Sequence, residues 1–474
     1  VIMGVKDFLF HLQTAVKSLY TKSDLNERAQ DLQVSDKMAA AITEWFRLFY
    51  ADEAEKNPDS HKTRFVSVLT NYMATLATNE IVLNTGSSAR AAFLKDQLDR
   101  FVLPQIRRDV QLAGVGGEVI LKPFVSGRNI YTEVIPADRF YPTRINGAGV
   151  VEAGFFTDYD KINNRTVVRV ERFDLRPEGL YLNNKAYYDG VSGLGTEIPL
   201  TEIYRWREIQ PDILLTGLDR VHFAALKMPF ANTVDNTSPL PVSIFADSAD
   251  ALRELDRIYS EFLWEIHTGK RKQIIDRRAL QPFKGKHPIP LSELSSDLYL
   301  VLNFGDDAGD KKIPFDDYTP EMRIDAYQKA IDIQLRLLEM QCGFSAGTFT
   351  FDVKTGKMTA TQIISEDKDT YNTVKSIQES GMSQGLRDLV YLYDWFATLY
   401  GLAPAGKIDA SVTFGDSIFE DTAVEFSRRK QLADGGYLKK EKLVGWYFGV
   451  SDEEAQKEYM PTEQTPDDIL FGKP

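Results

Sequence analysis

The chain has 474 residues, 43% of them hydrophobic and 11% aromatic, and a formal net charge of −13 at pH 7. That length and apolar content suffice for about two or three domains, whereas no run of about 18 apolar residues exists, which excludes a membrane span. The acidic balance argues against a protein that grips nucleic acid through its phosphates, although nucleic acid can still slide past such a surface. Cys342 is the only cysteine, so an intramolecular disulfide is impossible and assembly inside a cell is expected.

Residues 1 to about 112 carry the apolar spacing of helices, and Ser35 can cap the first clear one because its hydroxyl can accept from a free backbone N–H. Three apolar stripes follow: Met38, Ile42, Trp45, Phe46 and Phe49; Phe65, Leu69, Tyr72 and Leu76; and Phe93, Leu94, Leu98 and Phe101. From Gly114 to about Lys227 the pattern changes to short β-branched and aromatic runs between Gly, Pro and Asn-Gly, which predicts an antiparallel sheet. The fold is therefore expected to be α+β.

A polar, Pro-bearing linker at residues 233–241 precedes the next predicted helix, which ends near Thr268. Its apolar stripe is Leu252, Leu255, Tyr259, Phe262 and Ile266. Acids lie near its start and cations at its end, an arrangement that complements the helix dipole.

The segment from Lys270 to Lys286 holds seven Lys or Arg and one acid, Asp276, and further acids such as Asp316 and Asp317 follow it. Beside the strand-like YLVLNF, this basic block can contact phosphate or an acidic protein partner. The alternative is an ordinary solvated surface whose charges pair between subunits.

The helix predicted over residues 320–342 is the element around which the chain is organised. One apolar stripe is Ile324, Tyr327, Ile331, Leu335 and Leu338, a second is Ala326, Ala330, Ile333, Leu337 and Met340, and a charged line is Asp325, Lys329, Asp332, Arg336 and Glu339. A surface helix on a globular core needs one apolar face, so two such faces predict a helix wedged between neighbours with its charged side in water. Identical subunits around a wet channel would give that arrangement. The alternative is burial inside one large domain with the charges at its rim.

A Gly-rich loop from Gly343 to about residue 358 separates this helix from a much longer one that ends near Gly401. Thr359 or Thr361 can cap the long helix. It contains two glycines that each cost roughly 1 kcal/mol relative to Ala, so a kink is expected near them: Gly381 and Gly385. A short strand over residues 407–414, two helical pieces around Phe426 and Leu443, and an acidic tail complete the chain.

A search for reaction chemistry finds none. The five histidines are scattered, with no i,i+4 pair and no neighbouring cysteine, so no metal or cofactor site is expected. The sequence VKTGKMT resembles the end of a phosphate-binding loop, but Phe351 stands where Gly is required and Met358 follows Lys357 in place of Ser or Thr. Two acid pairs are able to hold Mg²⁺, although surface acids are the commoner explanation: Asp306 with Asp307, and Asp316 with Asp317. The chain is therefore predicted not to be an enzyme.

Three stretches resemble the portal proteins of tailed bacteriophages, in particular those of siphophages of Gram-positive hosts. Residues 343–378, GFSAGTFTFDVKTGKMTATQIISEDKDTYNTVKSIQ, are similar to the segment at the start of the long helix in those portals. Residues 102–143 are similar to their helix-to-strand passage, and residues 419–459 resemble their C-terminal helices. Together they span most of the chain in the order found in the family, and none of them is catalytic.

The resemblance implies a portal fold with a helical stem, a mixed wing domain, a small α/β clip and a short helical crown, assembled as a ring of usually twelve copies at one capsid vertex. Mapped onto this chain, the wing would be residues 1–241 (helices, then antiparallel strands) together with residues 359–415 (a long kinked helix and a return strand). The stem helices would be residues 242–268 and 320–342, and the clip between them would be residues 269–319. The channel loop would be residues 343–358, and the crown with its acidic tail would be residues 416–474.

The resemblance also implies roles for individual residues. The stem residues that line the channel would be Asp325, Lys329, Asp332, Arg336 and Glu339. The loop residues that face DNA would be Phe344, Ser345, Thr348, Phe349, Lys354 and Lys357. The clip residues that bind partners would be Lys270, Arg271, Lys272, Arg277, Arg278, Lys284 and Lys286. Because a duplex must move without sticking, the channel face is expected to be acidic overall, with isolated cations in the loop.

The implied partners are other copies of the chain, double-stranded DNA that passes through the channel in packaging and ejection, the terminase, the major capsid and scaffolding proteins, and the head–tail adaptor. The protein would belong to the virion, assemble in the host cytoplasm and contact no membrane. Two other interpretations stay open. One is a different head-completion or minor capsid protein, and the other is a nucleotide-processing enzyme, suggested by the acid pairs and the incomplete phosphate loop.

Overall fold

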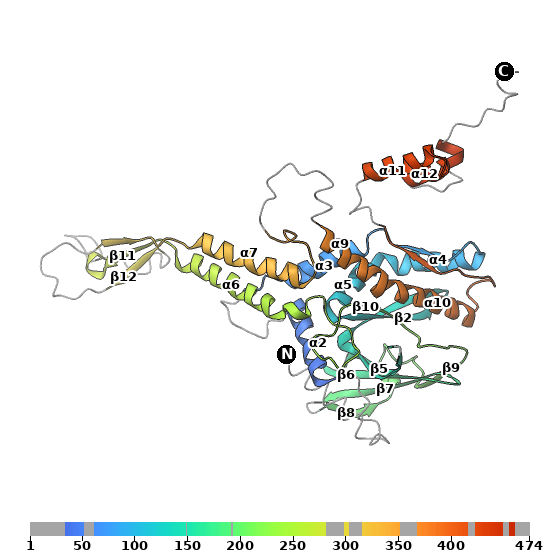
Figure 1. Cartoon of the computed structure of the whole chain (residues 1–474). Coiled ribbons are helices and arrows are strands. Elements are labelled where there is room, and N and C mark those ends of the chain that lie inside the picture. The colour runs from blue at the N-terminus through green and yellow to red at the C-terminus, as the bar shows by residue number, and fades with distance from the viewer. Residues whose placement is uncertain are drawn as a thin grey trace.

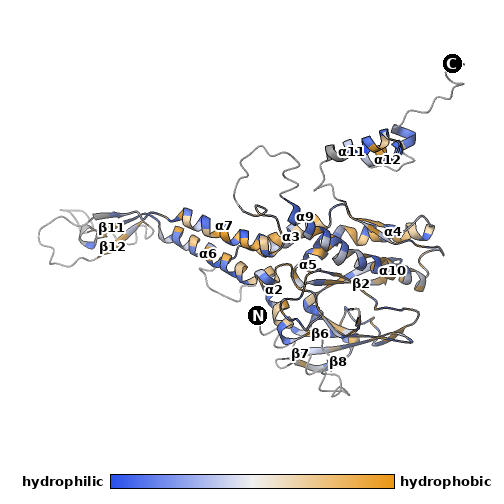
Figure 2. Cartoon of the chain, viewed as in Figure 1, coloured by the Kyte–Doolittle hydropathy of each residue, from blue (hydrophilic) through white to orange (hydrophobic). Residues whose placement is uncertain are grey.

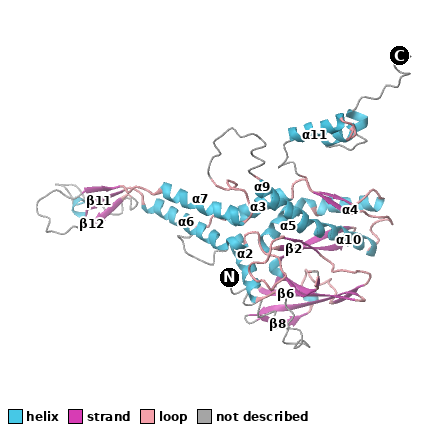
Figure 3. Ribbon diagram, in the orientation of Figure 1, coloured by secondary structure: helices cyan, strands magenta, loops and turns pink. Residues whose placement is uncertain are grey.

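The computed structural model describes residues 34–51, 61–147, 149–190, 193–280, 298–302, 315–350, 367–415, 422–448 and 455–459. A body of helices and sheets carries a pair of long antiparallel helices that project from it and end in a small sheet, and a short helical pair lies apart from the body near the C-terminus (Figure 1). The fold is α+β, as predicted, and Figure 3 shows strands both at the tip of the projection and in the body.

The described helices are α2 (Asp36–Tyr50), α3 (Phe65–Ala77), α4 (Ala89–Phe101), α5 (Ile106–Gly116), α6 (Ala249–Thr268), α7 (Ile324–Gln341), α9 (Lys368–Ser376), α10 (Ser383–Leu399), α11 (Thr422–Asp434) and α12 (Lys440–Phe448). The described strands are β1 (Val82–Asn84), β2 (Glu118–Ser126), β3 (Asn129–Pro136), β4 (Phe140–Ile145), β5 (Val151–Ile162), β6 (Arg165–Arg176), β7 (Gly179–Gly190), β8 (Gly193–Ile198), β9 (Asp212–Leu215), β10 (Ala224–Lys227), β11 (Lys272–Asp276), β12 (Tyr299–Leu302), β13 (Phe315–Tyr318) and β14 (Ser411–Thr413).

The helices of the body form where the apolar stripes predict them. The Ser35 hydroxyl accepts a hydrogen bond from the Met38 N–H at 3.2 Å and caps α2, which confirms the predicted start of that helix. Helices α3 and α5 pack against each other, and α2 lies on α5. Apolar residues of these helices fill the core between them and are nearly inaccessible: Met38, Trp45, Leu69, Met73 and Val110.

Two antiparallel sheets make up the β part of the body. The smaller has the strand order β10-β2-β3, and α10 packs on β10 and β2. The larger has the order β4-β5-β6-β7-β8, with β9 also paired to β7. The β5–β6 hairpin turns at Asn163 and Asn164, whose φ angles of 46° and 63° lie in the left-handed region that asparagine tolerates better than most residues.

The two glycines of the long helix are explained by a close approach of strand β10. A Cβ atom on Gly381 would lie 2.2 Å from the Lys227 carbonyl oxygen, and one on Gly385 would lie 2.1 Å from that of Ala225. Between α9 and α10 the helix forms a π-helical turn over Ile377–Met382, at the point where a kink was predicted. The glycines therefore allow the helix to rest directly on the backbone of the small sheet.

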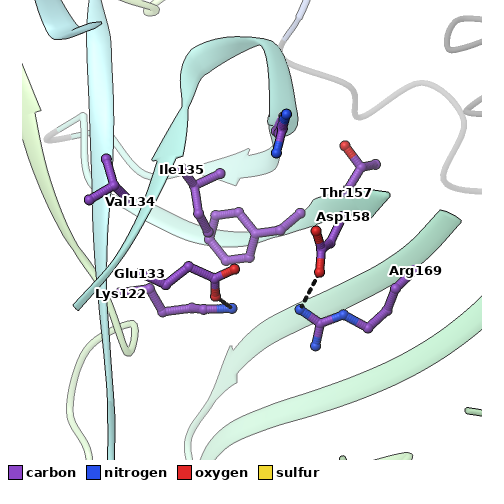
Figure 4. Close-up of a pocket in the computed structure, with 9 residues that line it drawn as sticks. Lys122, Glu133, Val134, Ile135, Thr157, Asp158 and Arg169 are labelled. Carbon is purple, nitrogen blue, oxygen red and sulfur yellow. Dashed lines mark ion pairs between the residues drawn. The ribbon is translucent and has the colours of Figure 1, made fainter. Parts of the chain in front are cut away.

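A buried ionic cluster joins the two sheets, and Figure 4 shows part of it, with Lys122 beside Glu133 and Arg169 beside Asp158. The Lys122 ammonium on β2 lies 2.9 Å from carboxylate oxygens of both Glu133 on β3 and Glu171 on β6. His222 Nε2 lies 3.0 Å from the other oxygen of Glu171, and Arg169 adds a guanidinium at 3.3 Å. Glu171 is 5% exposed; burial opposes its ionisation, but Lys122, His222 and Arg169 together hold the pKa of the carboxyl well below its ordinary value. The ionised form of Glu171 is thus tied to its partners in the folded chain.

Glu171 and Glu197 provide a matched test of burial, because each lies within 3.4 Å of a lysine of the same β part. The variant Glu171→Gln leaves Lys122 and Arg169 buried with less compensation, and we expect it to lower the free energy of unfolding by about 3–5 kcal/mol. The exposed pair of Lys185 with Glu197 is screened by water, so Glu197→Gln should cost about 0–1 kcal/mol. Chemical denaturation of both variants measures the difference, and equal costs would contradict a structural role for the cluster.

Candidate channel site

The projecting pair of helices is held together by one apolar seam and an ion pair. Leu252 and Leu255 of α6 and Leu335 and Leu338 of α7 are buried, and Figure 2 shows orange, hydrophobic residues interleaved with blue ones along both helices. At the far end the Arg323 guanidinium lies 2.5 Å from the Glu265 carboxylate, and the Phe262 and Tyr327 rings are 5.6 Å apart. The first predicted stripe of α7 is thus the one that packs on α6.

The second predicted stripe of α7 is covered only in part within the described chain, because Leu337 packs against the main core and Ala330 is half-buried, whereas its other members are exposed. Ile333 is 64% exposed and Met340 is 70% exposed, and Ala326 on the same stripe is also exposed. Their neighbours on the first stripe are shielded, since Ile331 packs against the main core and Leu335 is 3% exposed. Among the described residues, helix α7 therefore buries most of its first apolar face and leaves Ala326, Ile333 and Met340 of the second exposed, so its two faces are not both buried in that part of the chain.

The charged line of α7 is present, but it is shorter than predicted. Asp325, Lys329 and Arg336 are exposed and Asp332 is half-buried. The fifth member, Glu339, is 1% exposed, so the expectation that it lines a channel is corrected by the structure. The remaining part of the line then contains two acids and two bases, and the predicted excess of acid on this face is absent from it.

Glu339 instead anchors the start of the Gly-rich loop. Its carboxylate accepts hydrogen bonds from the backbone N–H groups of Gly347 at 2.9 Å, Phe349 at 2.5 Å and Thr350 at 3.1 Å. Its backbone carbonyl accepts from the Phe344 N–H at 2.8 Å. A buried carboxylate is costly unless its oxygens are satisfied, and three N–H donors meet that requirement. The last turn of α7 and the root of the loop are consequently one unit.

The aromatic residues of the loop root pack inward, against expectation. Phe344 is 3% exposed, and Phe344 and Phe349 make edge-to-face contacts with Tyr72 of α3 at 5.8 and 5.3 Å between ring centroids. Phe65 contacts Phe349 in the same way at 5.2 Å. Four rings in this arrangement stabilise the root more than exposure to a polar channel would. The burial of Phe344 contradicts its predicted contact with DNA, whereas the contact predicted for the half-buried Phe349 stays a prediction.

Polar contacts tie the same root to the start of α9. The Ser345 N–H donates to Thr370 Oγ1 at 2.8 Å, and the Thr370 N–H donates to Ser345 Oγ at 3.1 Å. Thr373 Oγ1 donates to the Gly343 carbonyl oxygen at 2.7 Å. Ser345 is 1% exposed, so its predicted contact with DNA is also corrected, while the half-buried Thr348 donates its hydroxyl to the Ser345 carbonyl oxygen at 2.6 Å. Lys354 and Lys357 lie outside the described residues, as do Thr359 and Thr361.

The basic block lies at the tip of the projection, where β11 pairs in parallel with β12 and antiparallel with β13. The Arg271 Nε donates to an Asp317 carboxylate oxygen at 2.9 Å, and this partner lowers the pKa of the Asp317 carboxyl. The register of the sheet thus brings a residue of the basic block together with the acids that follow it. Lys270 and Arg277 are exposed and Lys272 is half-buried. Arg278 belongs to the short 3-10 turn that follows β11, and Lys284 and Lys286 lie outside the described residues.

Sequence patterns did not predict the contacts that fix the loop root. Thr370 and Thr373 belong to no recognisable sequence motif, and their partners Ser345 and Gly343 lie on the other side of the Gly-rich loop. For Glu339 a signal existed, since a carboxylate near the end of a helix that runs into a Gly-rich segment can capture the free N–H groups of that segment.

The described part of the chain contains no group of three or more His, Cys, Asp or Glu side chains that could hold a metal ion. Among the same residues, no helix combines the length and apolar character needed to cross a bilayer. The acid pair Asp306/Asp307 and the incomplete phosphate loop with Phe351 and Met358 fall outside the described residues. The single cysteine, Cys342, is buried behind α7 with its Sγ 3.4 Å from Ser248 Oγ, and burial raises the pKa of its thiol to about 12.

Removing the Glu339 carboxylate should loosen the loop root. We expect Glu339→Ala to lower the free energy of unfolding by about 2–4 kcal/mol, because several buried N–H donors lose a charged acceptor. Hydrogen exchange at the amides of Gly347, Phe349 and Thr350 should become faster in this variant. The control Asp325→Ala, on the exposed line of the same helix, should change neither quantity appreciably. Unchanged exchange at these three amides would contradict the anchoring role.

Comparisons with known proteins give one family match and several structural likenesses. Residues 117–467 match the family model "Phage portal protein, SPP1 Gp6-like". The virion of a native gene transfer agent (GTA) particle contains a chain with 11% identity and a TM-score of 0.43, with 98% of this chain and 99% of that chain covered. The neck of the native GTA particle, computed with C12 symmetry, gives 12% identity, a TM-score of 0.45 and coverage of 86% and 93%. The neck of the empty particle, computed with C6 symmetry, contains a chain with 10% identity and a TM-score of 0.41, with 93% of this chain and 99% of that chain covered. No curated protein sequence matches the chain.

Proposed function

The chain belongs to the SPP1 Gp6-like family of phage portal proteins, and from this membership we infer that it is one subunit of a ring at a capsid vertex through which the phage genome passes. In this proposal the ring has twelve copies, belongs to the virion and assembles in the host cytoplasm. The family is a structural one, so we infer that the chain conducts DNA without catalysing a reaction on it.

The observation that carries the proposal is the open apolar face of α7. Ile333 and Met340 lie on a helix whose opposite face is already packed on α6. Exposed apolar area costs about 25 cal/mol per Å² relative to its burial, so a face of this kind favours association with an apolar surface. In a ring, the α6–α7 pair of the next copy supplies that surface. The pair is then the stem, the sheet β12-β11-β13 the clip, and α11 with α12 the crown.

The charged line of α7 is the part of the stem that we assign to the channel. When neighbouring copies cover the faces on either side, Asp325, Lys329, Asp332 and Arg336 are left to meet water. Equal numbers of acids and bases give this lining little net charge, so few phosphate counterions are released when a duplex lies beside it. A duplex can then slide past the stem without strong binding, which is what packaging and ejection require.

The clip is the proposed docking surface for the terminase and later for the head–tail adaptor, because it stands at the end of the projection farthest from the body (Figure 1). Two cations of the basic block, Lys270 and Arg277, have exposed side chains there. Exposed cations at this place suit acidic protein segments. The major capsid and scaffolding proteins are the proposed partners of the body.

An acidic residue on the open face should stop the ring from closing. We expect the double variant Ile333→Asp, Met340→Asp to fold but to lower the assembled mass from about that of twelve copies to that of monomers or small oligomers, because burying two carboxylates between stems is costly. Light scattering with negative-stain imaging measures this. The control Val150→Asp, Leu214→Asp places the same charges at residues that are 50% and 47% exposed at or beside the larger sheet, and it should leave the ring intact. A stable monomer formed by the unaltered chain would overturn the proposed function.

Positive charge on the channel line should retard DNA. The double variant Asp325→Lys, Asp332→Lys adds cations on every subunit, and we expect rings of normal mass but DNA packaging reduced by about tenfold or more. The control Glu254→Lys, Glu261→Lys introduces the same change of charge at exposed positions of α6. Packaged DNA per particle is the readout. Equal packaging by the two variants would show that the α7 line does not face the genome.

A further inference from the structure

The hairpin of α11 and α12 is strongly basic in an acidic protein. Residues 422–448 contain six Lys or Arg and three acids, a formal charge of +3, in a chain whose net charge is −13. The two helices are separated from the body in Figure 1 and contact each other. A local field of this sign attracts anions whatever the net charge of the whole chain.

Aromatic contacts hold the hairpin together. The Phe426 and Tyr447 rings lie 5.1 Å apart, and the Arg429 guanidinium lies over the Trp446 ring at 4.5 Å from its centroid. The chain reverses at Gly435 and Gly436, and Gly436 has a φ of 75°, which favours glycine. These contacts leave Phe426 and Trp446 half-buried and Tyr447 57% exposed, and the lysines of the hairpin are exposed as well.

Four lysines form the basic patch of the hairpin: Lys430, Lys439, Lys440 and Lys442. Each is exposed, and none of them forms an ion pair with another described residue. This differs from the exposed arginines of the stem helices, where Arg257 pairs with Glu254 and Glu261, and Arg253 pairs with Glu44. These two arginines are neutralised within the chain, whereas no described residue forms an ion pair with the lysines of the basic patch.

We propose that the basic patch binds the phosphates of double-stranded DNA, at the end of the chain opposite the clip. The inference rests on the proposed function, which places a duplex next to this protein. Duplex DNA carries one charge per about 1.7 Å of its axis, so it can engage several separate lysines at once and release their counterions. Lysines on an open surface act as point charges without a fork geometry or a pocket for base edges, so the binding is independent of sequence. The stem lets the duplex slide, and the basic patch holds it.

The test measures binding of the assembled full-length protein to a fluorescent duplex circle that is covalently closed and relaxed, and therefore has no end to enter a channel. Fluorescence polarisation is recorded over a range of NaCl concentrations. The variant Lys439→Gln, Lys440→Gln, Lys442→Gln removes three cations of the patch. The matched control Lys37→Gln, Lys161→Gln, Lys407→Gln removes three exposed lysines elsewhere.

The unaltered protein should bind the circle, and binding should weaken steeply with salt. In the patch variant, the slope of log Kobs against log salt should fall by about 0.9 for each phosphate that the protein no longer neutralises. The control should keep the slope of the unaltered protein. The proposal is overturned if the unaltered protein does not bind the circle, if the patch variant keeps its full slope, or if the slope of the control falls as far. Binding of an acidic peptide in place of the circle, abolished by the same three substitutions, would assign the patch to a protein partner and would also overturn it.

Ring formation is measured on the same samples by light scattering. A ring that forms without binding the circle refutes the basic patch and leaves the proposed function standing. A chain that binds the circle through these lysines but stays monomeric refutes the ring and leaves the patch. The two inferences therefore fail separately.

Discussion

Helix α7 does not bury both of its apolar faces among the described residues of its own chain. The hydrophobic effect favours burial of each face, but α6 covers only one of them, and the body of the protein meets α7 only near its last turns. Ile331 and Ile333 are two residues apart and differ in burial, since Ile331 packs against the core and Ile333 is 64% exposed. The part of the fold that projects from the body is therefore incomplete as a monomer, and assembly is a requirement of its surface chemistry.

The C-terminal end of α7 is fixed by many contacts, whereas the middle of the helix has an exposed apolar face. The Glu339 carboxylate, the Ser345–Thr370 pair and the ring cluster around Tyr72 bind the root of the Gly-rich loop to α7, α9 and α3 together. Because charged hydrogen bonds and ring contacts act in the same few residues, the root has little freedom relative to these helices. A shift of α7 would be passed directly to α3 and α9, and the loop would start from a displaced root.

The body supplies the fixed frame for these elements. Helix α10 lies on the small sheet at van der Waals distance, which Gly381 and Gly385 make possible, and the cluster around Glu171 joins that sheet to the larger one. An ionic cluster of this kind is less a source of stability than a constraint on how the sheets fit, because its charges are satisfied in one arrangement only. The exposed charges of α6 and α7 have no such effect, since water screens them.

The sequence alone determined the elements that depend on local period. The stripes from Met38 to Phe101, the change to strands near Gly114, the helix with two apolar faces and the break near Gly381 follow from spacing, and the structure contains all of them. The family resemblance also came from contiguous stretches, and the family match across residues 117–467 agrees with it. Period and motif are properties of neighbouring residues, so they can be recognised without knowing which distant segments meet.

Only the tertiary structure decided which side of an element is used. Glu339 and Asp325 share one line on α7, yet the first is enclosed by the loop root and the second is exposed. Phe344 belongs by its sequence context to a glycine-rich loop, and its burial becomes apparent only when Tyr72, far away in the chain, is placed beside it. Burial and pairing depend on contacts with other segments, near or far in the chain. The helical period fixes a residue's position on its helix but does not predict which segment will pack against it.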